Sequence, residues 1–346
     1  MNRFKIPGAP SWMAATLAFG TLFGGIAALP SPGSTAYAAS AESVSANTVT
    51  AERGALLKML AMCQWASGDF YSDPANARYQ AVKAASDHAD VLLLDPDTSS
   101  SKLTASYNTL NSALDAYIAD YIRDASILER QTFQMSRMLN ASIGTTPGTY
   151  PQQAADAMFV VIDQAQAVAY DPNATVQQFR EQYRKYVEGA AALRDSANFD
   201  RADRLSALNA QRQEIDALPA SIPGDENYAK LSAAFDKQAD RLEALLNDSS
   251  SGMLAVESAA HCVQTAYDAL KEGGQLANEL TEARKLMDSP KGIRSGQYPS
   301  SSFGELRKAI NKSAAVLSKV STQSQLTAAR TSLAEAVVKF KSALRP

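Results

Sequence analysis

Apolar residues spaced three and four positions apart recur along this chain, and this pattern constrains the fold more than any other feature. Four helical segments open with two apolar residues seven positions apart, and the starts of these segments are 76, 77 and 70 residues apart. The pairs are Leu103 and Leu110, Phe179 and Tyr186, Val256 and Val263, and Leu326 and Leu333. Side chains at such spacings share one face of an α-helix. No stretch alternates apolar and polar residues for long enough to predict a sheet, so we expect an all-α protein.

Two further helices precede each of these segments. The second helices are expected at 79–92, 155–168, 228–242 and 303–317, and the opening helices at 56–65, 133–139, 205–218 and 276–287. Each set repeats apolar residues on one helical face. The sequence therefore predicts a tandem array of three-helix bundles, with units at 39–124, 125–197, 198–273 and 274–346.

The joins between these units predict how the array is connected. No Gly or Pro occurs from Lys102 to Ser142, and Gly189 is the only such residue between 175 and 218. Since nothing there favours a helix break, the last helix of one unit is expected to continue into the first helix of the next, as in spectrin-type rods. Gly273-Gly274 is expected to break the third join. We therefore predict an elongated rod with spectrin-like continuous joins.

Capping patterns predict several helix ends. Thr175-x-x-Gln178, Ser302-x-x-Glu305 and Thr322-x-x-Gln325 place a hydroxyl three residues before Gln or Glu, which is the pattern of a capping box at a helix start. Asp95-Pro96 and Asp171-Pro172 are expected to end the preceding helices, because proline disfavours helical geometry in the residue before it.

Residues 1–38 have the pattern of a secretory signal peptide. Arg3 and Lys5 supply a positive start, residues 13–29 carry no charge, and Ala36-Tyr37-Ala38 forms an A-x-A cleavage site. The alternative is an uncleaved membrane anchor, but the uncharged run is shorter than the ~20 residues of a spanning helix. We expect a secreted product, extracellular or associated with the cell surface, with no membrane span after cleavage.

Charge and histidine content argue against several functions. The formal net charge is −3 with the two signs interspersed, whereas nucleic-acid binding requires a concentrated positive face. His88 and His261 are the only histidines, and no partners for a zinc site or a Ser-His-Asp triad accompany them. His261 precedes Cys262, but neighbours on a helix point about 100° apart. We therefore expect no catalytic centre, no metal site and no cofactor.

The two cysteines are expected to be free. Cys63 and Cys262 fall in the first and third predicted units. A disulfide requires Cα atoms within about 7 Å, and a straight rod would hold these units far apart. The sequence therefore predicts two buried thiols.

A loop motif carries a family resemblance. Gly296-Gln297-Tyr298-Pro299 is echoed by Gly148-Thr149-Tyr150-Pro151, 148 residues earlier. With the helical runs that follow the later loop, these residues resemble the FIVAR-type three-helix modules of Gram-positive secreted and surface proteins. They are also similar to helical repeats appended to polysaccharide-degrading enzymes. The resemblance covers the last unit best, and it implies carbohydrate or surface binding and a spacer role.

The loop tyrosines are the candidate ligand-binding residues. Tyr150 and Tyr298 each precede proline, Gln297 stands beside Tyr298, and Tyr71 occupies the corresponding loop of the first unit. Sugar rings bury apolar faces on exposed aromatic rings, so these residues predict a polysaccharide site. In the other interpretation, Tyr-Pro caps the end of its bundle.

We expect a secreted, non-catalytic binding or spacer module for cell-wall or extracellular polysaccharide. The alternative is a protein-binding surface scaffold or adhesin that uses its helix faces.

Overall fold

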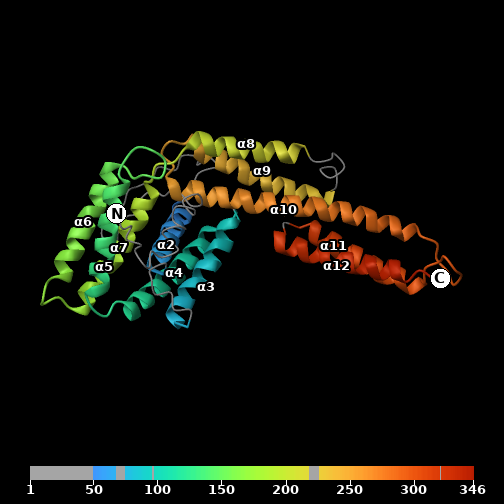
Figure 1. Ribbon diagram of the computed structural model, residues 1–346, viewed down its shortest axis with the longest axis horizontal. Helices are drawn as coiled ribbons and strands as arrows, with labels where there is room; N and C mark the ends of the chain where they lie inside the picture. Colours follow the sequence, from blue (N-terminus) through green and yellow to red (C-terminus); the bar gives the residue numbers. More distant parts are fainter. Residues whose placement is uncertain (1–49, 68–74, 96, 218–225, 320) are drawn as a thin grey trace, which may run out of the picture. The chain divides into compact units, whose positions relative to one another are not determined.

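The computed structural model describes residues 50–67, 75–95, 97–217, 226–319 and 321–346 (Figure 1). Within these ranges it contains eleven α-helices, one short 3-10 helix and no strand, so the all-α prediction is confirmed. The elements are α2 (Ala51–Ser67), α3 (Ala77–Leu94), α4 (Ser100–Tyr121), α5 (Ser126–Ser142), α6 (Gln152–Ala169), α7 (Val176–Asp195), α8 (Arg201–Asp216), α9 (Glu226–Asn247), α10 (Met253–Lys285), η1 (Leu286–Asp288), α11 (Ser300–Leu317) and α12 (Gln323–Ser342). The predicted signal peptide at 1–38 lies outside the described residues.

The chain divides into two compact units. The first comprises the described residues up to Arg201 together with Ala244–His261, and the second comprises Ala202–Glu243 together with Cys262–Pro346. α9 and α10 contribute residues to both units. The division into four three-helix units and the rod stay predictions.

α2 lies at the centre of the first unit. Its side chains are buried on nearly every side, and among them are Leu56, Met59, Leu60 and Cys63. A helix that is apolar all round must be covered all round, and α2 packs against α3, α4 and α7. α5, α6 and α7 also pack on one another. The contact between α2 and α7 therefore joins two groups of three helices into one core.

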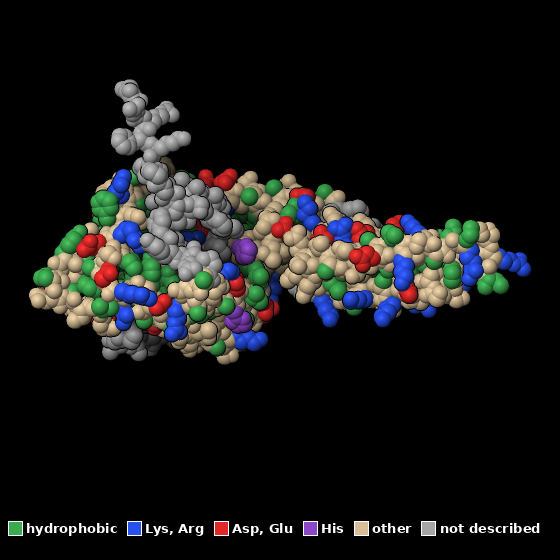
Figure 2. Space-filling model, turned by 60° about the horizontal axis from the view of Figure 1, so that its bottom comes forward, with side chains coloured by type: hydrophobic (Ala, Val, Ile, Leu, Met, Phe, Trp, Pro, Cys, Tyr) green, Lys and Arg blue, Asp and Glu red, His purple; other side chains and the backbone are tan. Residues whose placement is uncertain are grey.

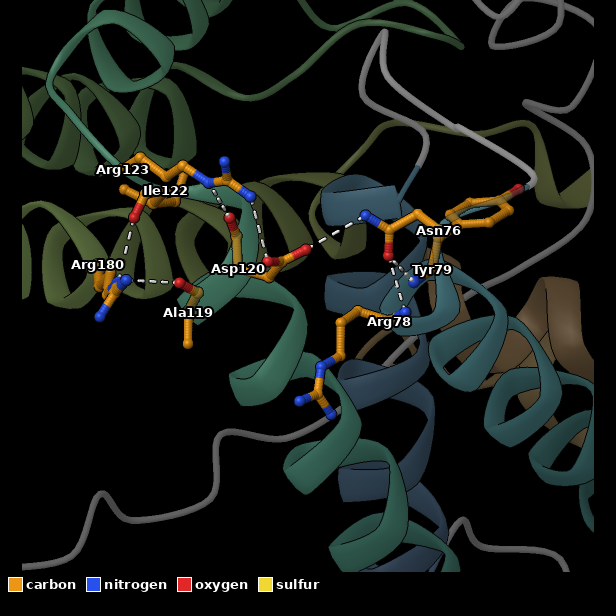
Figure 3. A network of polar contacts seen from close by, with 8 residues as sticks. All are labelled: Asn76, Arg78, Tyr79, Ala119, Asp120, Ile122, Arg123 and Arg180. Carbon is orange, nitrogen blue, oxygen red and sulfur yellow. Dashed lines mark hydrogen bonds and ion pairs between the residues drawn. The ribbon is translucent and has the colours of Figure 1, made fainter.

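The first predicted continuous join is wrong, because α4 ends at Tyr121 and α5 begins at Ser126. Ile122 leaves the helical conformation and is fully buried. The guanidinium of Arg180, on α7, donates to the freed carbonyls of Ala119 and Ile122, and Figure 3 shows this arrangement. The carboxylate of Asp124 accepts from the backbone N–H of Ser126 at 2.8 Å. Side chains, rather than Gly or Pro, interrupt the helix here.

The second predicted continuous join is also wrong. α7 ends at Asp195, and α8 begins only at Arg201. The segment between them turns back on a distant loop, where the N–H of Asn198 donates to the carbonyl of Thr149 at 2.8 Å. Asp195 accepts from the N–H of Leu254 at 3.1 Å, near the start of α10. These long-range contacts replace the local hydrogen bonds that a continuous helix would make.

The predicted break at Gly273-Gly274 is absent, since α10 runs through both residues. Each glycine costs a helix about 1 kcal/mol relative to alanine. Gly273 is buried, and a Cβ built on it would lie 2.5 Å from Cδ1 of Leu231 on α9. The missing side chain therefore permits α9 and α10 to approach closely, and that packing offsets the cost.

The predicted helix ends have mixed outcomes. The capping boxes at Thr175 and Thr322 are both present. Ser302 is not a cap, because α11 already begins at Ser300 after Pro299. α3 ends at the residue before Asp95, as its proline signal predicts. α6 ends at Ala169, two residues before Asp171.

Charged contacts connect the helices of the second unit. Arg212 on α8 pairs with Asp240 and Glu243 on α9 at 2.7 and 2.5 Å. Arg330 on α12 pairs with Glu272 and Glu279 on α10 at 2.9 and 2.6 Å. α11 packs along α12, so α12 holds α11 beside the second half of α10.

Candidate functional site

The loop around Tyr150 is closed by backbone hydrogen bonds, and we call residues 142–151 the first clasp. The N–H of Tyr150 donates to the carbonyl of Ser142 at 2.8 Å, and the N–H of Gly144 donates to the carbonyl of Tyr150 at 3.0 Å. Gly148 has a φ of 84°, in the left-handed region that favours glycine. Its N–H donates to the carbonyl of Asn198, just after α7, at 2.8 Å. The loop is thereby tied to the end of the third helix of its group.

Residues 290–299 form a second clasp with the same pattern. The N–H of Tyr298 donates to the carbonyl of Pro290 at 2.9 Å, and the N–H of Gly292 donates to the carbonyl of Tyr298 at 3.0 Å. Gly296 has a φ of 76°. Its N–H donates to the carbonyl of Arg345, just after α12, at 3.0 Å. The echo in the sequence is therefore a structural repeat of the loop.

The repetition extends beyond the clasps. α6 and α11 each have 18 residues, and α7 and α12 each have 20. Proline is the N-cap of both α6 and α11, and a Thr-Gln capping box starts both α7 and α12. We call residues 142–198 the first hairpin and 290–345 the second hairpin. Positions in α6 and α11 correspond at an offset of 148, and positions in α7 and α12 at an offset of 147.

The candidate tyrosines are half-buried parts of these clasps. The ring of Tyr298 stacks on Phe340 with centroids 4.4 Å apart and meets Phe303 edge-on at 6.4 Å. Burial raises the pKa of Tyr150, and the nearby charge of Arg194 opposes this shift. A sugar ring needs an open aromatic face, and Phe340 covers one face of Tyr298.

Gln297 is also engaged within the second clasp. Its side-chain Oε1 accepts from the backbone N–H of Arg294 at 2.9 Å. Tyr71, the remaining candidate, lies outside the described residues. The geometry of the described candidates favours the interpretation in which Tyr-Pro caps its bundle, and sugar binding by these side chains stays a prediction.

An open groove of about 920 Å³ runs between α11 and α12 in the second hairpin. Lys308, Lys312 and Lys319 line it from α11 and its C-terminal end. Small side chains on both helices form much of the rest, including Ala309, Ser313, Ala328, Ala329 and Ser332. Lys and Arg side chains are spread along this part of the surface on the right of Figure 2, where Figure 1 places α11 and α12.

The three lysines give the groove an excess of positive charge. All three are exposed, and within the described part of the chain no ion pair involves their ammonium groups. Glu305 is the only acidic residue among the described residues that line the groove, and it pairs with Lys339 at 2.7 Å. The sequence analysis missed this site because charges of both signs are interspersed along the chain and conceal the three lysines. The spacing of four residues, which keeps Lys308 and Lys312 on one face of α11, is the signal that could have revealed it.

The first hairpin differs from the groove at two of its lysines and at several of its small side chains, although Ala165 and Ala167 occupy the positions of Ser313 and Ala315. Val160 and Gln164 occupy the positions of Lys308 and Lys312. On the second helix of the hairpin, the larger Glu181 and Lys185 occupy the positions of Ala328 and Ser332. Because the same helices and clasp form with either set, the hairpin fold does not require a lysine-lined groove.

The remaining reactive side chains do not form a second site. His88 is exposed on α3, and His261 is half-buried on α10, where burial lowers its pKa. Cys63 and Cys262 are both buried, and neither forms a disulfide, which confirms the thiol prediction. Among the described residues, no cluster of three or more His, Cys, Asp or Glu side chains is suited to a metal ion. No helix in those ranges is long and apolar enough to cross a membrane.

Comparisons with known proteins give no family for this chain: no family model, no curated protein and no solved structure matches it. The resemblance to FIVAR-type modules therefore stays a prediction from the sequence.

Proposed function

We propose that this is a secreted, non-catalytic protein that binds cell-wall or extracellular polysaccharide, and that the groove between α11 and α12 is its binding site. The observation that carries the proposal is the groove itself, an open channel of about 920 Å³ along two helices. An extended polymer can lie along an open groove of this kind. The pattern of residues 1–38 supports export.

The groove also offers polar groups suited to a hydroxylated ligand. Gln325 and Ser332 line it and are exposed. The hydroxyl of Ser321 donates to the carbonyl of Val316 at 2.8 Å and keeps its lone pairs as acceptors. Ligand sites typically place a few polar groups among apolar side chains, and the alanines of α11 and α12 supply apolar surface here.

The comparison of the two hairpins supplies the test. Ala328→Glu combined with Ser332→Lys would install the larger residues of the first hairpin and fill the groove without changing net charge. Retention on an insoluble cell-envelope glycan fraction is then measured by cosedimentation. We expect the wild type to be retained and the double variant to be lost into the supernatant.

A matched control changes α12 outside the groove. Thr331→Lys with Ala334→Glu adds the same charges at exposed positions that do not line it, and this variant should be retained like the wild type. Helical circular dichroism and the melting temperature verify folding of each variant. Retention of the groove-filled variant at the wild-type level would rule the groove out.

The alternative function is a protein-binding scaffold or adhesin. It is favoured by exposed apolar side chains on α5 and α6, where Phe133 is 59% exposed and Val160 is 55% exposed. If the face of α5 that carries Phe133 binds a partner, Phe133→Ser should weaken capture of an envelope protein. The same variant should leave glycan retention unchanged.

A further inference from the structure

We infer that the ligand of this groove is a polyanion, namely a glycopolymer whose repeating units are joined by phosphodiesters. This inference rests on the proposed function and names the chemistry of the ligand. It is carried by the lysine row, by the side chains that the groove lacks, and by the contrast between the two hairpins.

The lysines form a row that matches an extended charged chain. Lys308 and Lys312 lie four residues apart on α11, about 6 Å along its axis at 1.5 Å per residue, and Lys319 lines the groove just beyond the helix end at Leu317. All three lysines line the same groove, so together they present several positive charges along it. A single small anion would meet one of them, whereas a polymer with regularly spaced charges can meet all three.

This positive row contrasts with the chain as a whole. The formal net charge of the protein is −3, and the corresponding helix positions of the first hairpin carry Val160 and Gln164. Both are exposed there, as Lys308 and Lys312 are. Val160 and Gln164 serve the hairpin fold equally well, so the fold does not require lysine at positions 308 and 312. Binding of a ligand accounts for the two lysines.

The side chains favour phosphate over carboxylate. Among the described residues, lysines line the groove and no arginine does. Arginine can form two parallel hydrogen bonds with a carboxylate or a phosphate, whereas lysine acts as a compact point charge and is a common binder of phosphate. Point charges of this kind suit a chain whose phosphodiesters recur at regular intervals.

The groove also lacks aromatic side chains, since no Phe, Tyr or Trp of the described ranges lines it. Binding of single-stranded nucleic acid relies on bases stacking on such rings, and binding of a neutral polysaccharide needs apolar surface of the same kind. Charge is the attraction that this groove supplies, so we assign it to a phosphodiester glycopolymer rather than to a nucleic acid or a neutral glycan.

The test uses lipid-free poly(glycerol phosphate) as the probe and compares it with polygalacturonate, neutral dextran and single-stranded DNA. Affinity of the whole protein for each is measured by fluorescence anisotropy. We expect poly(glycerol phosphate) to bind best. Its affinity should fall roughly tenfold or more between about 50 and 200 mM salt, as for other linear polyphosphates that contact three charges.

The decisive variant is Lys308→Val with Lys312→Gln, which installs the residues of the first hairpin. Removing two charge contacts should weaken binding to poly(glycerol phosphate) by about tenfold and leave the melting temperature near that of the wild type. Lys102→Gln with Lys185→Gln removes the same charge from exposed positions in the first compact unit, and it should bind like the wild type.

The outcomes separate the inference from the proposed function. Retention on whole envelope glycan without binding to poly(glycerol phosphate) would overturn the inference and leave the proposed function standing. Equal or tighter binding to polygalacturonate, dextran or single-stranded DNA would also overturn it, and each would name a different ligand class. Loss of binding in the Lys102/Lys185 control would show attraction by overall charge rather than by the groove.

Discussion

Gly273 offers a direct test of how closely α9 and α10 pack. Gly273→Ala has two opposing effects on the free energy of unfolding. Alanine is favoured over glycine in a helix interior by about 1 kcal/mol. Its Cβ would lie 2.5 Å from Cδ1 of Leu231, a side chain that is 2% exposed and has little room to move. Overpacking of this kind costs about 1–3 kcal/mol, so we expect a net loss of about 0–2 kcal/mol.

Gly304→Ala is the matched reference. Gly304 lies inside α11 and is exposed, and a Cβ added to it would meet no atom of the described chain within 4 Å. The same substitution there should stabilise by up to about 1 kcal/mol. The difference between the two variants, about 1–3 kcal/mol, is the overpacking cost alone.

Urea unfolding followed by circular dichroism of the helices measures both variants. An unchanged urea dependence of the unfolding free energy shows that the comparison is valid. Leu231→Val removes the atom that the new Cβ would meet, so the cost of Gly273→Ala should shrink in that background. If Gly273→Ala stabilises the protein as much as Gly304→Ala, then the close approach of the two helices is not real.

Three further predictions concern the clasps, a half-buried acid and a buried thiol. Gly148→Ala and Gly296→Ala should each destabilise the fold by about 1–2 kcal/mol. Left-handed backbone strain is the only cause, since no atom of the described chain lies within 4 Å of either Cβ position. The two variants should therefore lower the melting temperature equally. Burial, with the charge of Asp87 second, raises the pKa of Asp90 to about 6. The folded state thus binds this proton more tightly than the unfolded chain, and the carboxylate destabilises the fold as pH rises from about 4 through 6. Asp90→Asn should therefore raise the melting temperature at pH 7.5 but not at pH 3.5. Burial raises the pKa of Cys63 to about 12, so this thiol should resist iodoacetamide at pH 8 until denaturant is added, and rapid labelling of the native protein would contradict the buried placement.

Local signals in the sequence were sufficient for the helices and for many of their ends. The apolar stripe that begins at Leu103 lies in α4, and the stripe that begins at Leu326 lies in α12. The capping boxes at Thr175 and Thr322 form as predicted. In these places short-range hydrogen bonding and periodic burial determine the structure, and both are readable from neighbouring residues.

The joins could not be predicted, because the groups that decide them are distant in the chain. Arg180 takes the carbonyls that end α4, although it lies 58 residues beyond Ile122. Leu231 fills the space left by Gly273, so that glycine allows close packing instead of breaking the helix. In both cases tertiary contacts outweigh local helix propensity.

The candidate site was likewise predictable only in part from the sequence. The sequence identified the two Gly-x-Tyr-Pro loops but not the burial of Tyr298 against Phe340, which comes from the far end of α12. The groove depends on which side chains of α11 and α12 face one another, and on the small size of Ala328 and Ser332. Neither property belongs to a single stretch of sequence.

Because main-chain groups close the clasps, the repeat is hard to recognise in the amino-acid sequence. Asn198 and Arg345 hold corresponding loops, and each contributes its N–H and its carbonyl. Asn198 also donates from its side chain to the carbonyl of Gly144 at 2.9 Å, but the two main-chain bonds are what the clasps share. Any residue with a backbone N–H can make these shared main-chain bonds, so the two clasps need not have the same residue at this position. What the clasp does demand is a glycine at positive φ and a proline that starts the next helix. Two copies of one architecture can therefore diverge until only a few residues are shared between them.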